Sequence, residues 1–158
     1  MRLGATFESN SYKQMIRGLG TDDYEKWLPL WRGYQRFYES TIPEETTRIS
    51  WERMLDPNEP CFGALAWNDD RAVGMVHWIL HRSNWTIGDY CYLQDLFVAP
   101  EARGQRVGRS LVEYVYADAE KRGCSRVYWL THETNSKAMQ LYDRIATRSG
   151  FIQYRKML

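Results

Sequence analysis

The residues best suited to chemistry in this sequence are three arginines and two glycines at positions 103–109. An apolar, aromatic run at 90–98 precedes them and is typical of a buried strand, and a run with helical periodicity ends at Gly123. A helix N-terminus presents unpaired N–H groups and a positive dipole end, and glycine lets a ligand approach the backbone. The segment therefore predicts an anion site, with phosphate as the anion. A tight strand–helix connection without a ligand is the alternative.

The glycine spacing fits neither the dinucleotide fingerprint GxGxxG nor the P-loop GxxxxGK[ST]. Arg103 and Gly108 instead fit the pattern [QR]xxGxG or [QR]xxGxA, preceded by a strand reading LxV, here Leu96 to Val98. In this the sequence resembles the acyl-coenzyme A loop of the GNAT acetyltransferase superfamily. Arg106 stands where that family usually has its first glycine. An arginine fits this position if its φ stays negative, and it could add a contact to phosphate.

The resemblance implies where acetyl-coenzyme A, the cosubstrate, would bind. In the family the LxV strand and the next parallel strand splay apart, and the pantetheine arm lies between them. A backbone N–H of the first strand, that of Phe97, is expected to bond the thioester carbonyl. No metal is implied. The residues implied in cosubstrate binding are Leu96, Phe97, Val98, Arg103, Gly104, Gln105, Arg106, Val107, Gly108, Arg109, Ser110, Asn135, Ala138 and Tyr142.

A second match lies in the run THETNSKAMQLYDR, which resembles the family pattern Nxx(A)xxLYxxxGF. Asn135, Ala138, Leu141 and Tyr142 fall in register. Asn135 and Tyr142 are two helical turns apart, so we expect both on one face of a helix. The resemblance assigns Asn135 to coenzyme binding and Tyr142 to protonating the departing thiolate, a role that a phenol neutral at pH 7 suits. A tyrosine packed in the core is the alternative.

The acceptor implied by the family is an amine, which must be neutral to attack. Freeing a lysine-like amine at pH 7 costs about 4.6 kcal/mol, and an α-amine about 1 kcal/mol, so a base is useful. The strand YLQDLFV is similar to the YLEDFFV-type strand of polyamine acetyltransferases, whose glutamate is the proposed base. Gln94 occupies that position and cannot take a proton. Asp95 is the next candidate, although strand alternation puts it on the face of Leu93 and Phe97. A buried carboxylate satisfied by backbone donors is the alternative.

Aromatic residues at helical spacing between 24 and 38 predict a helix with an aromatic stripe. A stripe that faces the core is the simpler interpretation. We assign its end, Tyr34 and Tyr38, to the acceptor site together with Gln94. His77 and Glu133 are weaker candidates for the base, because lone residues of these types usually fill the surface or the core.

Composition limits the class of protein. The 158 residues suffice for one domain, and a net charge of +1 does not suggest nucleic-acid binding. Three scattered cysteines without metal-ligand spacing predict a reduced, cytoplasmic setting. No apolar run is as long as a membrane span, so no membrane partner is expected. We expect residues 1–14 to be an extension and residues 15–158 to form the domain.

The remaining pattern predicts an α/β fold. Strands are expected at 15–17, 61–67, 72–80, 90–98, 126–131 (buried on both faces) and 151–157. Helices are expected from a Thr21 cap, from Pro43, after the basic loop and at 136–146. Pro29 should kink or break the first helix. An insertion at 144–149 precedes the terminal strand. The resemblance implies a single-domain GNAT fold: a mixed, mostly antiparallel sheet with splayed central parallel strands, flanked by helices.

The resemblance also implies the reaction: transfer of acetyl from acetyl-coenzyme A to a primary amine by direct attack, with Tyr142 and Asp95 as catalytic residues. The acceptor would be a polyamine, an amino acid, another small amine or a lysine side chain. No cysteine lies near the motif, so we do not expect a covalent acyl-enzyme. The alternative is a non-catalytic acyl-coenzyme A sensor or interaction module. By analogy with the fold, the terminal strand offers an edge for a homodimer.

Overall fold

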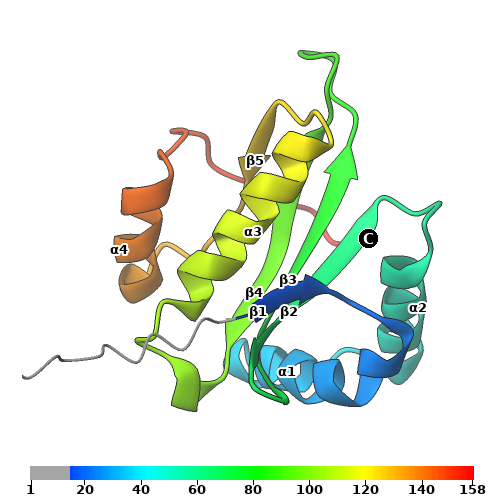
Figure 1. Ribbon diagram of the computed structural model, residues 1–158. Helices are drawn as coiled ribbons and strands as arrows, with labels where there is room; N and C mark the ends of the chain where they lie inside the picture. The colour runs from blue at the N-terminus through cyan, green and yellow to red at the C-terminus, as the bar shows by residue number, and fades with distance from the viewer. Residues whose placement is uncertain (1–14) are drawn as a thin grey trace, which may run out of the picture.

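A five-stranded sheet forms the centre of the molecule (Figure 1). The structure, a computed structural model, describes residues 15–158, so the extension expected at 1–14 lies outside the described residues. Neighbouring strands are antiparallel except β4 and β5, which are parallel, and the predicted mixed fold is confirmed. The strands lie in chain order: β1 (Met15–Gly18), β2 (Cys61–Asn68), β3 (Arg71–His81), β4 (Tyr90–Val98) and β5 (Arg126–Tyr128).

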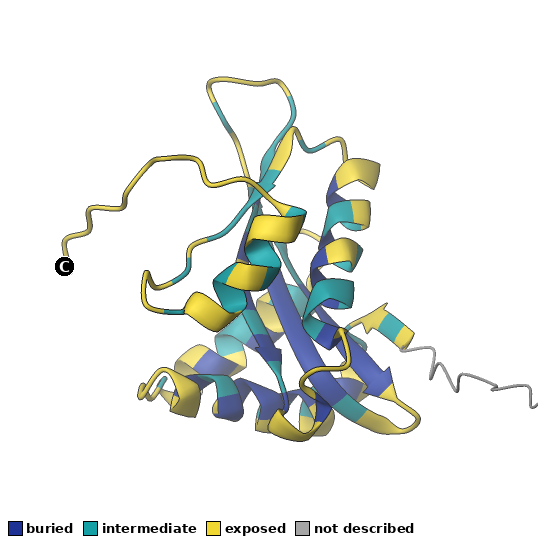
Figure 2. Cartoon of the chain, turned by 90° about the vertical axis from the view of Figure 1, so that its left-hand side faces the viewer, coloured by how far each residue is buried: buried dark blue, intermediate teal, exposed yellow. Residues whose placement is uncertain are grey.

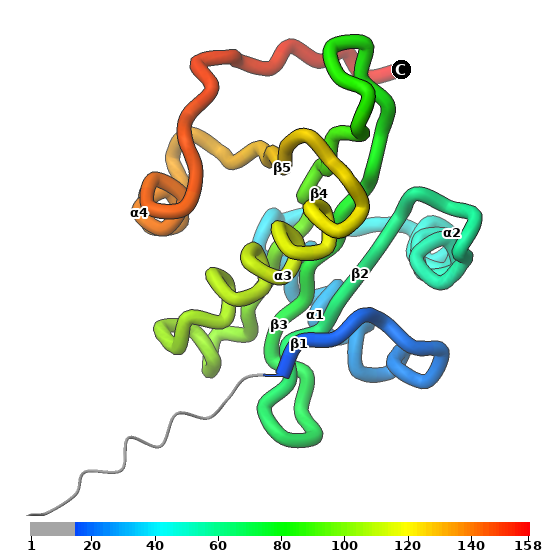
Figure 3. The backbone as a smooth tube through the Cα atoms, turned by 45° about the horizontal axis from the view of Figure 1, so that its top comes forward, coloured from blue at the N-terminus to red at the C-terminus, as the bar shows by residue number. Residues whose placement is uncertain are grey.

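Helices cover both faces of this sheet (Figures 1 and 3). On one face lie α1 (Tyr24–Phe37) and α2 (Glu44–Leu55), and on the other lies α3 (Val107–Lys121). The helix α4 (Ser136–Ile145) stands at the β5 side of the molecule. Single turns of 3-10 helix, η1 (Thr21–Asp23) and η2 (Pro100–Ala102), precede α1 and the basic loop. All four predicted helices are present in the described residues.

Two details at the start of α1 differ from the prediction. Pro29 does not break α1, which is continuous from Tyr24 to Phe37. Pro29 lies inside the helix, where it removes one main-chain hydrogen bond without ending the element. Thr21 is not the cap: the Asp23 carboxylate instead accepts a bond from the Gly20 N–H, at 2.7 Å.

The sheet separates two apolar cores, visible as buried residues on both of its sides (Figure 2). The core beneath α3 includes Val76, Trp78, Leu93, Leu111 and Val112. The core beneath α1 and α2 includes four tryptophans, with Leu65, Met75 and Phe97. The simpler interpretation of the aromatic stripe is therefore correct for its first half. The tryptophans are Trp27, Trp31, Trp51 and Trp67, of which the first two lie on the stripe.

A bulge interrupts β4 at its centre. Leu93 pairs with Trp78 and Asp95 pairs with His77, so Gln94 is an extra residue without a partner in the ladder. An extra residue reverses the alternation of side chains, and bulges commonly re-aim side chains beside functional sites. Leu93 consequently packs in the core beneath α3, whereas Asp95 faces α1. The expectation that Asp95 shares a face with Leu93 was wrong.

The last two predicted strands also differ. β5 covers only Arg126–Tyr128, is not buried on both faces, and its pairing with β4 ends at Tyr92 and Tyr128. Beyond this point the chain leaves β4, as expected for splayed strands. The strand predicted at 151–157 is wrong: these residues have no regular structure, and the segment stands away from the body in Figure 2. A strand needs a neighbour to pair its main-chain groups, and this segment has none within the described chain.

Candidate active site

The basic loop leads directly into the N-terminus of α3. Gly104 has φ of 79°, and Arg106 has φ of 63° at the N-cap of α3. The condition under which an arginine fits this position, a negative φ, is therefore not met. This arginine adopts the left-handed conformation that its resemblance to a glycine position suggests, at a cost of roughly 1–2 kcal/mol. Arg106 therefore strains the backbone at a position where glycine would cause no strain.

The free donors of this helix end follow from its hydrogen bonds. The Ser110 N–H already bonds the Arg106 carbonyl at 3.0 Å, so it belongs to the helix ladder. In a helix the amides before it, those of Val107, Gly108 and Arg109, lack such partners. The Arg109 guanidinium bonds Glu113 at 2.8 Å, and the Arg103 Nε bonds the Val98 carbonyl at 3.1 Å. Backbone amides and the Arg106 charge are thus the groups suited to an anion here.

Asp95 is the buried acid at the bulge of β4. Its exposed fraction is 8%, and its Oδ2 lies 3.0 Å from Nδ1 of His77 on β3. Nε2 of His77 in turn lies 2.8 Å from the indole Nε1 of Trp27 on α1. His77 is not a second base exposed to an acceptor, because it is 7% exposed and both ring nitrogens are occupied. The alternative of an Asp95 satisfied only by backbone donors is wrong.

Tyrosines surround the open side of Asp95. Burial raises the pKa of Tyr34, and the negative charge of Asp95 and a hydrogen bond to it raise it further. Burial followed by the charge of Asp95 also raises the pKa of Tyr38 and of Tyr92. Tyr34 and Tyr38 lie side by side, with ring centroids 4.9 Å apart. A carboxylate with aromatic rings around it is suited to an ammonium or amine group.

Gln94 and Glu133 take no part in this buried network. Gln94, the bulged residue, is exposed, and Glu133 is exposed in the segment before α4. Tyr92 and Trp27 were not singled out from the sequence. Trp27 and His77 are 50 positions apart, and no local signal links two residues at that separation.

Tyr142 lies on α4, beside the end of α1. Its ring meets Trp129 edge to face, with centroids 5.3 Å apart. Burial raises the pKa of Tyr142, and the neighbouring Tyr38 raises it further. Tyr38 is also the tyrosine at the end of α1 whose pKa the charge of Asp95 raises.

Two other predicted site residues, Asn135 and Ala138, lie at the start of α4. Asn135 precedes the first turn of α4, and its amide nitrogen bonds Thr131 Oγ1 at 3.3 Å. Ala138 is half-buried. A Cβ at Gly108 would lie 3.9 Å from Leu141 of α4, so an alanine is also compatible with this position. α4 and the N-terminus of α3 are therefore close neighbours.

The three residues that end β4 point to both sides of the sheet. Leu96 and Val98 pack against the core beneath α3, and Phe97 packs in the core beneath α1. A Cβ at Gly33 of α1 would lie 2.8 Å from the Phe97 ring, so glycine is needed for α1 to approach β4 this closely. Nothing in the sequence pattern pointed to this role of Gly33.

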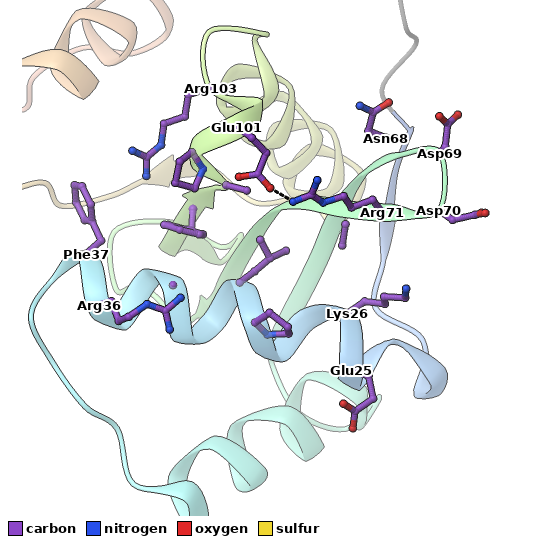
Figure 4. Close-up of a pocket in the computed structure, with 17 residues that line it drawn as sticks. Glu25, Lys26, Arg36, Phe37, Asn68, Asp69, Asp70, Arg71, Glu101 and Arg103 are labelled. Carbon is purple, nitrogen blue, oxygen red and sulfur yellow. Dashed lines mark hydrogen bonds and ion pairs between the residues drawn. The ribbon is translucent and has the colours of Figure 1, made fainter.

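A groove of about 970 Å³ adjoins the basic loop (Figure 4). Arg36, Phe37 and Arg103 gather at one end of it, and an Arg71–Glu101 ion pair crosses its wall. Asp95 and Tyr142 do not line it. The groove is therefore a surface feature beside the candidate site and not the place where the predicted catalytic residues meet.

Two features are absent from residues 15–158. None of their helices is both long and apolar enough to cross a bilayer. In the same residues, no three His, Cys, Asp or Glu side chains gather in a way that could hold a metal ion.

Comparison with known proteins gives consistent matches. The model of the acetyltransferase (GNAT) family matches residues 27–146. The D-amino-acid N-acetyltransferase HPA3 of Saccharomyces cerevisiae is 33% identical over 144 residues, which are 90% of this chain and 89% of that protein. A thialysine N-ε-acetyltransferase of Sus scrofa is 38% identical over 76 residues, 48% of this chain and 44% of that protein.

Solved structures share the fold. A probable acetyltransferase superposes with a TM-score of 0.80 at 24% identity, covering 91% of this chain and 97% of that chain. The aminoglycoside N-acetyltransferase AAC(6')-Iy in complex with CoA superposes with a TM-score of 0.77 at 19% identity, covering 92% and 95%. At these identities the structural likeness establishes the architecture alone.

Proposed function

This chain belongs to the acetyltransferase (GNAT) family and is an N-acetyltransferase, and we propose that it transfers acetyl from acetyl-coenzyme A to a primary amine by direct attack. The observation that carries this proposal is a buried carboxylate, Asp95, held by His77 at 3.0 Å with a tyrosine, Tyr34, beside it. We assign the acceptance of the amine proton to Asp95. We assign the donation of a proton to the thiolate to Tyr142, a phenol of α4 whose pKa is raised by burial.

The diphosphate of the cosubstrate would bind at the N-terminus of α3. The donors are the amides of Val107, Gly108 and Arg109, aided by the charge of Arg106, and this set suits a phosphate. The pantetheine arm would then run along Leu96–Val98 of β4, where β5 no longer pairs. A main-chain N–H of that segment, which we assign to Phe97, would bond the thioester carbonyl and its oxyanion.

The amine would enter from the side of α1, among Tyr34, Tyr38 and Gln94. Asp95 accepts its proton, which lowers a cost of up to about 4.6 kcal/mol for a lysine-like amine at pH 7. The neutral nitrogen attacks the thioester carbonyl carbon, and the C–S bond breaks as the tetrahedral intermediate collapses. The second proton that the nitrogen loses on becoming an amide returns to the phenolate that is left once Tyr142 has protonated the sulfur. Tyr142 donates a proton to the departing sulfur, and its raised pKa keeps the phenol protonated for this step.

The acceptor we propose is a small primary amine that is cationic before it binds. The relatives are named for D-amino acids and thialysine, and another for aminoalkylphosphonates, all of which carry an amine. In this protein the proposed amine site has one carboxylate, Asp95, and three tyrosines whose pKa its charge raises: Tyr34, Tyr38 and Tyr92. These groups favour an ammonium group over a neutral one. A lysine side chain of a protein has the same chemistry and is the second acceptor to test.

We further propose a homodimer that forms through the C-terminal segment. Phe151 and Tyr154 are each 90% exposed, and Leu158 is fully exposed. β5 offers an unpaired edge within the described sheet, next to a groove lined by Tyr116 and Val127. If two copies exchanged this segment, its apolar side chains would be buried and the edge of β5 would gain hydrogen-bond partners. Light scattering should give a dimer for the full chain and a monomer for residues 1–149; a monomeric full chain would contradict the exchange.

The function is tested by thiol release from acetyl-coenzyme A. We would measure release with polyamines, amino acids of both hands, aminoglycosides and a basic peptide. At least one amine should be acetylated, as mass spectrometry of the product would show. Coenzyme A binding without acetylation of any of these amines would favour the alternative, a non-catalytic acyl-coenzyme A sensor.

A further inference from the structure

Three buried side chains from three separate elements form a chain of hydrogen bonds that ends at Asp95. Trp27 is fully buried, and His77 and Asp95 are 7% and 8% exposed. The bond from Trp27 to His77 is 2.8 Å long, and His77 lies 3.0 Å from Asp95. The bulge at Gln94 creates this contact, because it places Asp95 opposite His77 in the ladder.

The direction of these bonds follows from the donor at one end. An indole N–H only donates, so Nε2 of His77 must accept from Trp27. A neutral imidazole with an accepting Nε2 carries its proton on Nδ1, and this N–H donates to Oδ2 of Asp95. An imidazolium would place two donors face to face at the bond to Trp27. The indole therefore selects one tautomer of one histidine.

We propose that Trp27 and His77 are positioning residues that hold Asp95 ready to accept the proton of the acceptor amine. The inference rests on the proposed function only for the role given to Asp95. A carboxylate has about four lone-pair sites, so one bond from His77 fixes its orientation and leaves capacity for the amine. A neutral donor also stabilises the carboxylate. An imidazolium in its place would add a positive charge next to Asp95, and that charge would make Asp95 a poorer base.

Three tyrosines within residues 15–158 have a pKa that the charge of Asp95 raises. They are Tyr34 on α1, Tyr38 at the end of α1, and Tyr92 on β4. The His77 ring contacts the rings of Trp27 and Trp31 on α1, at 5.9 and 5.2 Å between centroids. The imidazole of His77 thus lies between the Asp95 carboxylate and the aromatic rings of α1.

Trp31 provides a matched control for Trp27. Both are buried tryptophans of α1 that contact the His77 ring, and both indoles donate a hydrogen bond. The Trp31 indole, however, bonds Thr47 at 3.2 Å and not His77. Trp27→Phe and Trp31→Phe therefore remove the same atoms from the same core, and only the first frees Nε2 of His77.

The first test is the tautomer, read from two-bond nitrogen–proton correlations of histidine in the wild-type protein. The chain has three histidines, so His77 can be assigned by comparison with exposed His81 and His132. We expect the Nδ1–H tautomer across roughly pH 6–8, where an ordinary imidazole titrates. The Nε2–H tautomer or an imidazolium would overturn the proposal, whether or not the protein acetylates amines.

The second test is kinetic. Trp27→Phe should lower kcat/KM about tenfold, mainly through kcat, and move the acidic limb of the pH profile to higher pH, because His77 can then take a second proton. Trp31→Phe should leave both unchanged. Equal losses in the two variants would overturn the proposal.

A second pair of variants covers the case in which Trp27→Phe does not fold. The amide of His77→Asn can replace the Nδ1–H donor, so this variant should keep several-fold more activity than His77→Ala. Equal activities of the two His77 variants would also overturn the proposal.

Discussion

The two sides of the proposed site are built in different ways. On the base side, Asp95 lies between β3 and α1, and its partners His77 and Trp27 are buried. On the acid side, Tyr142 lies on α4, a helix without a single buried residue. Its contacts include a bond from the Tyr116 hydroxyl to the Ile145 carbonyl, at 2.9 Å, the Trp129 ring against Tyr142, and Ile145 against the core beneath α3.

The difference shows that the fold alone orients the side chains of the base side but not those of the acid side. The carboxylate is oriented by the core before any ligand binds, which is the arrangement that makes a catalytic group effective. The phenol depends on the position of a lightly held helix next to the cosubstrate loop. We expect bound cosubstrate and the C-terminal segment of a second copy to fix α4. Damage to the base side should therefore be the more severe.

The largest effect is expected from Asp95→Asn, which keeps the shape but cannot accept a proton. The variant should lose at least about 100-fold in kcat/KM, the usual scale of general-base catalysis. Asp118→Asn is the matched control, because Asp118 also accepts a bond from a tryptophan indole, Trp78, at 3.0 Å, but on the α3 side. Steady-state kinetics of both variants measure the loss. If kcat/KM of Asp95→Asn stays within threefold of the wild-type value, Asp95 is not the general base.

A smaller loss is expected from Tyr142→Phe. Removing the proton donor should lower kcat about tenfold while calorimetry shows unchanged affinity for coenzyme A. Tyr114→Phe on α3 serves as the control for losing a phenol elsewhere in the same fold. If Tyr142→Phe loses more activity than Asp95→Asn, the expected order of the two sides is reversed. If neither turnover nor binding changes, Tyr142 lies outside the site.

Arg106→Gly should act in opposite directions on stability and on binding. Glycine adopts φ of 63° without strain, so the free energy of unfolding should rise by up to about 1 kcal/mol. Loss of the charge should weaken coenzyme A binding several-fold, and more so at low salt. Gly104→Ala is the reverse case: at φ of 79° it should destabilise, although the surrounding space is open. Tighter coenzyme A binding by Arg106→Gly would show that Arg106 has no part in holding phosphate.

The smallest effect concerns stability at alkaline pH. Burial raises the pKa of Tyr34, Tyr38 and Tyr142 in the folded protein, so the folded state holds protons that the unfolded state releases from about pH 10. The stability that these tyrosines contribute is complete below that pH and is lost as pH rises further. Urea midpoints between roughly pH 8 and 11 should fall less steeply for Tyr34→Phe than for wild type. Identical slopes would mean that Tyr34 is not protected from ionisation.

Periodic segments were predictable from the sequence. β4 and α3 carry strong periods, and the sequence predicts a strand, a basic glycine loop and a helix in succession, all three of which the structure contains. The assignment of Asp95, Tyr38 and Tyr142 to a single site stays a prediction. Their catalytic roles stay predictions.

Features that depend on partners distant in the sequence were not predictable. One extra residue, Gln94, reverses the faces of β4, and no propensity marks it as a bulge. The apolar residues at 151–157 have the composition of a strand but no neighbour in the described chain, since composition does not show which edge a segment will pair with. The bond between Trp27 and His77 joins residues 50 positions apart.

The most direct test of the central claim is hydrogen–deuterium exchange of the full chain with and without coenzyme A. The account requires one ligand to reach from the N-terminus of α3 to the open edge of β4. Amides at 103–110 and at 96–98 should become protected together, while those of β1 should not change. Binding seen by calorimetry without protection at 103–110 would contradict the account.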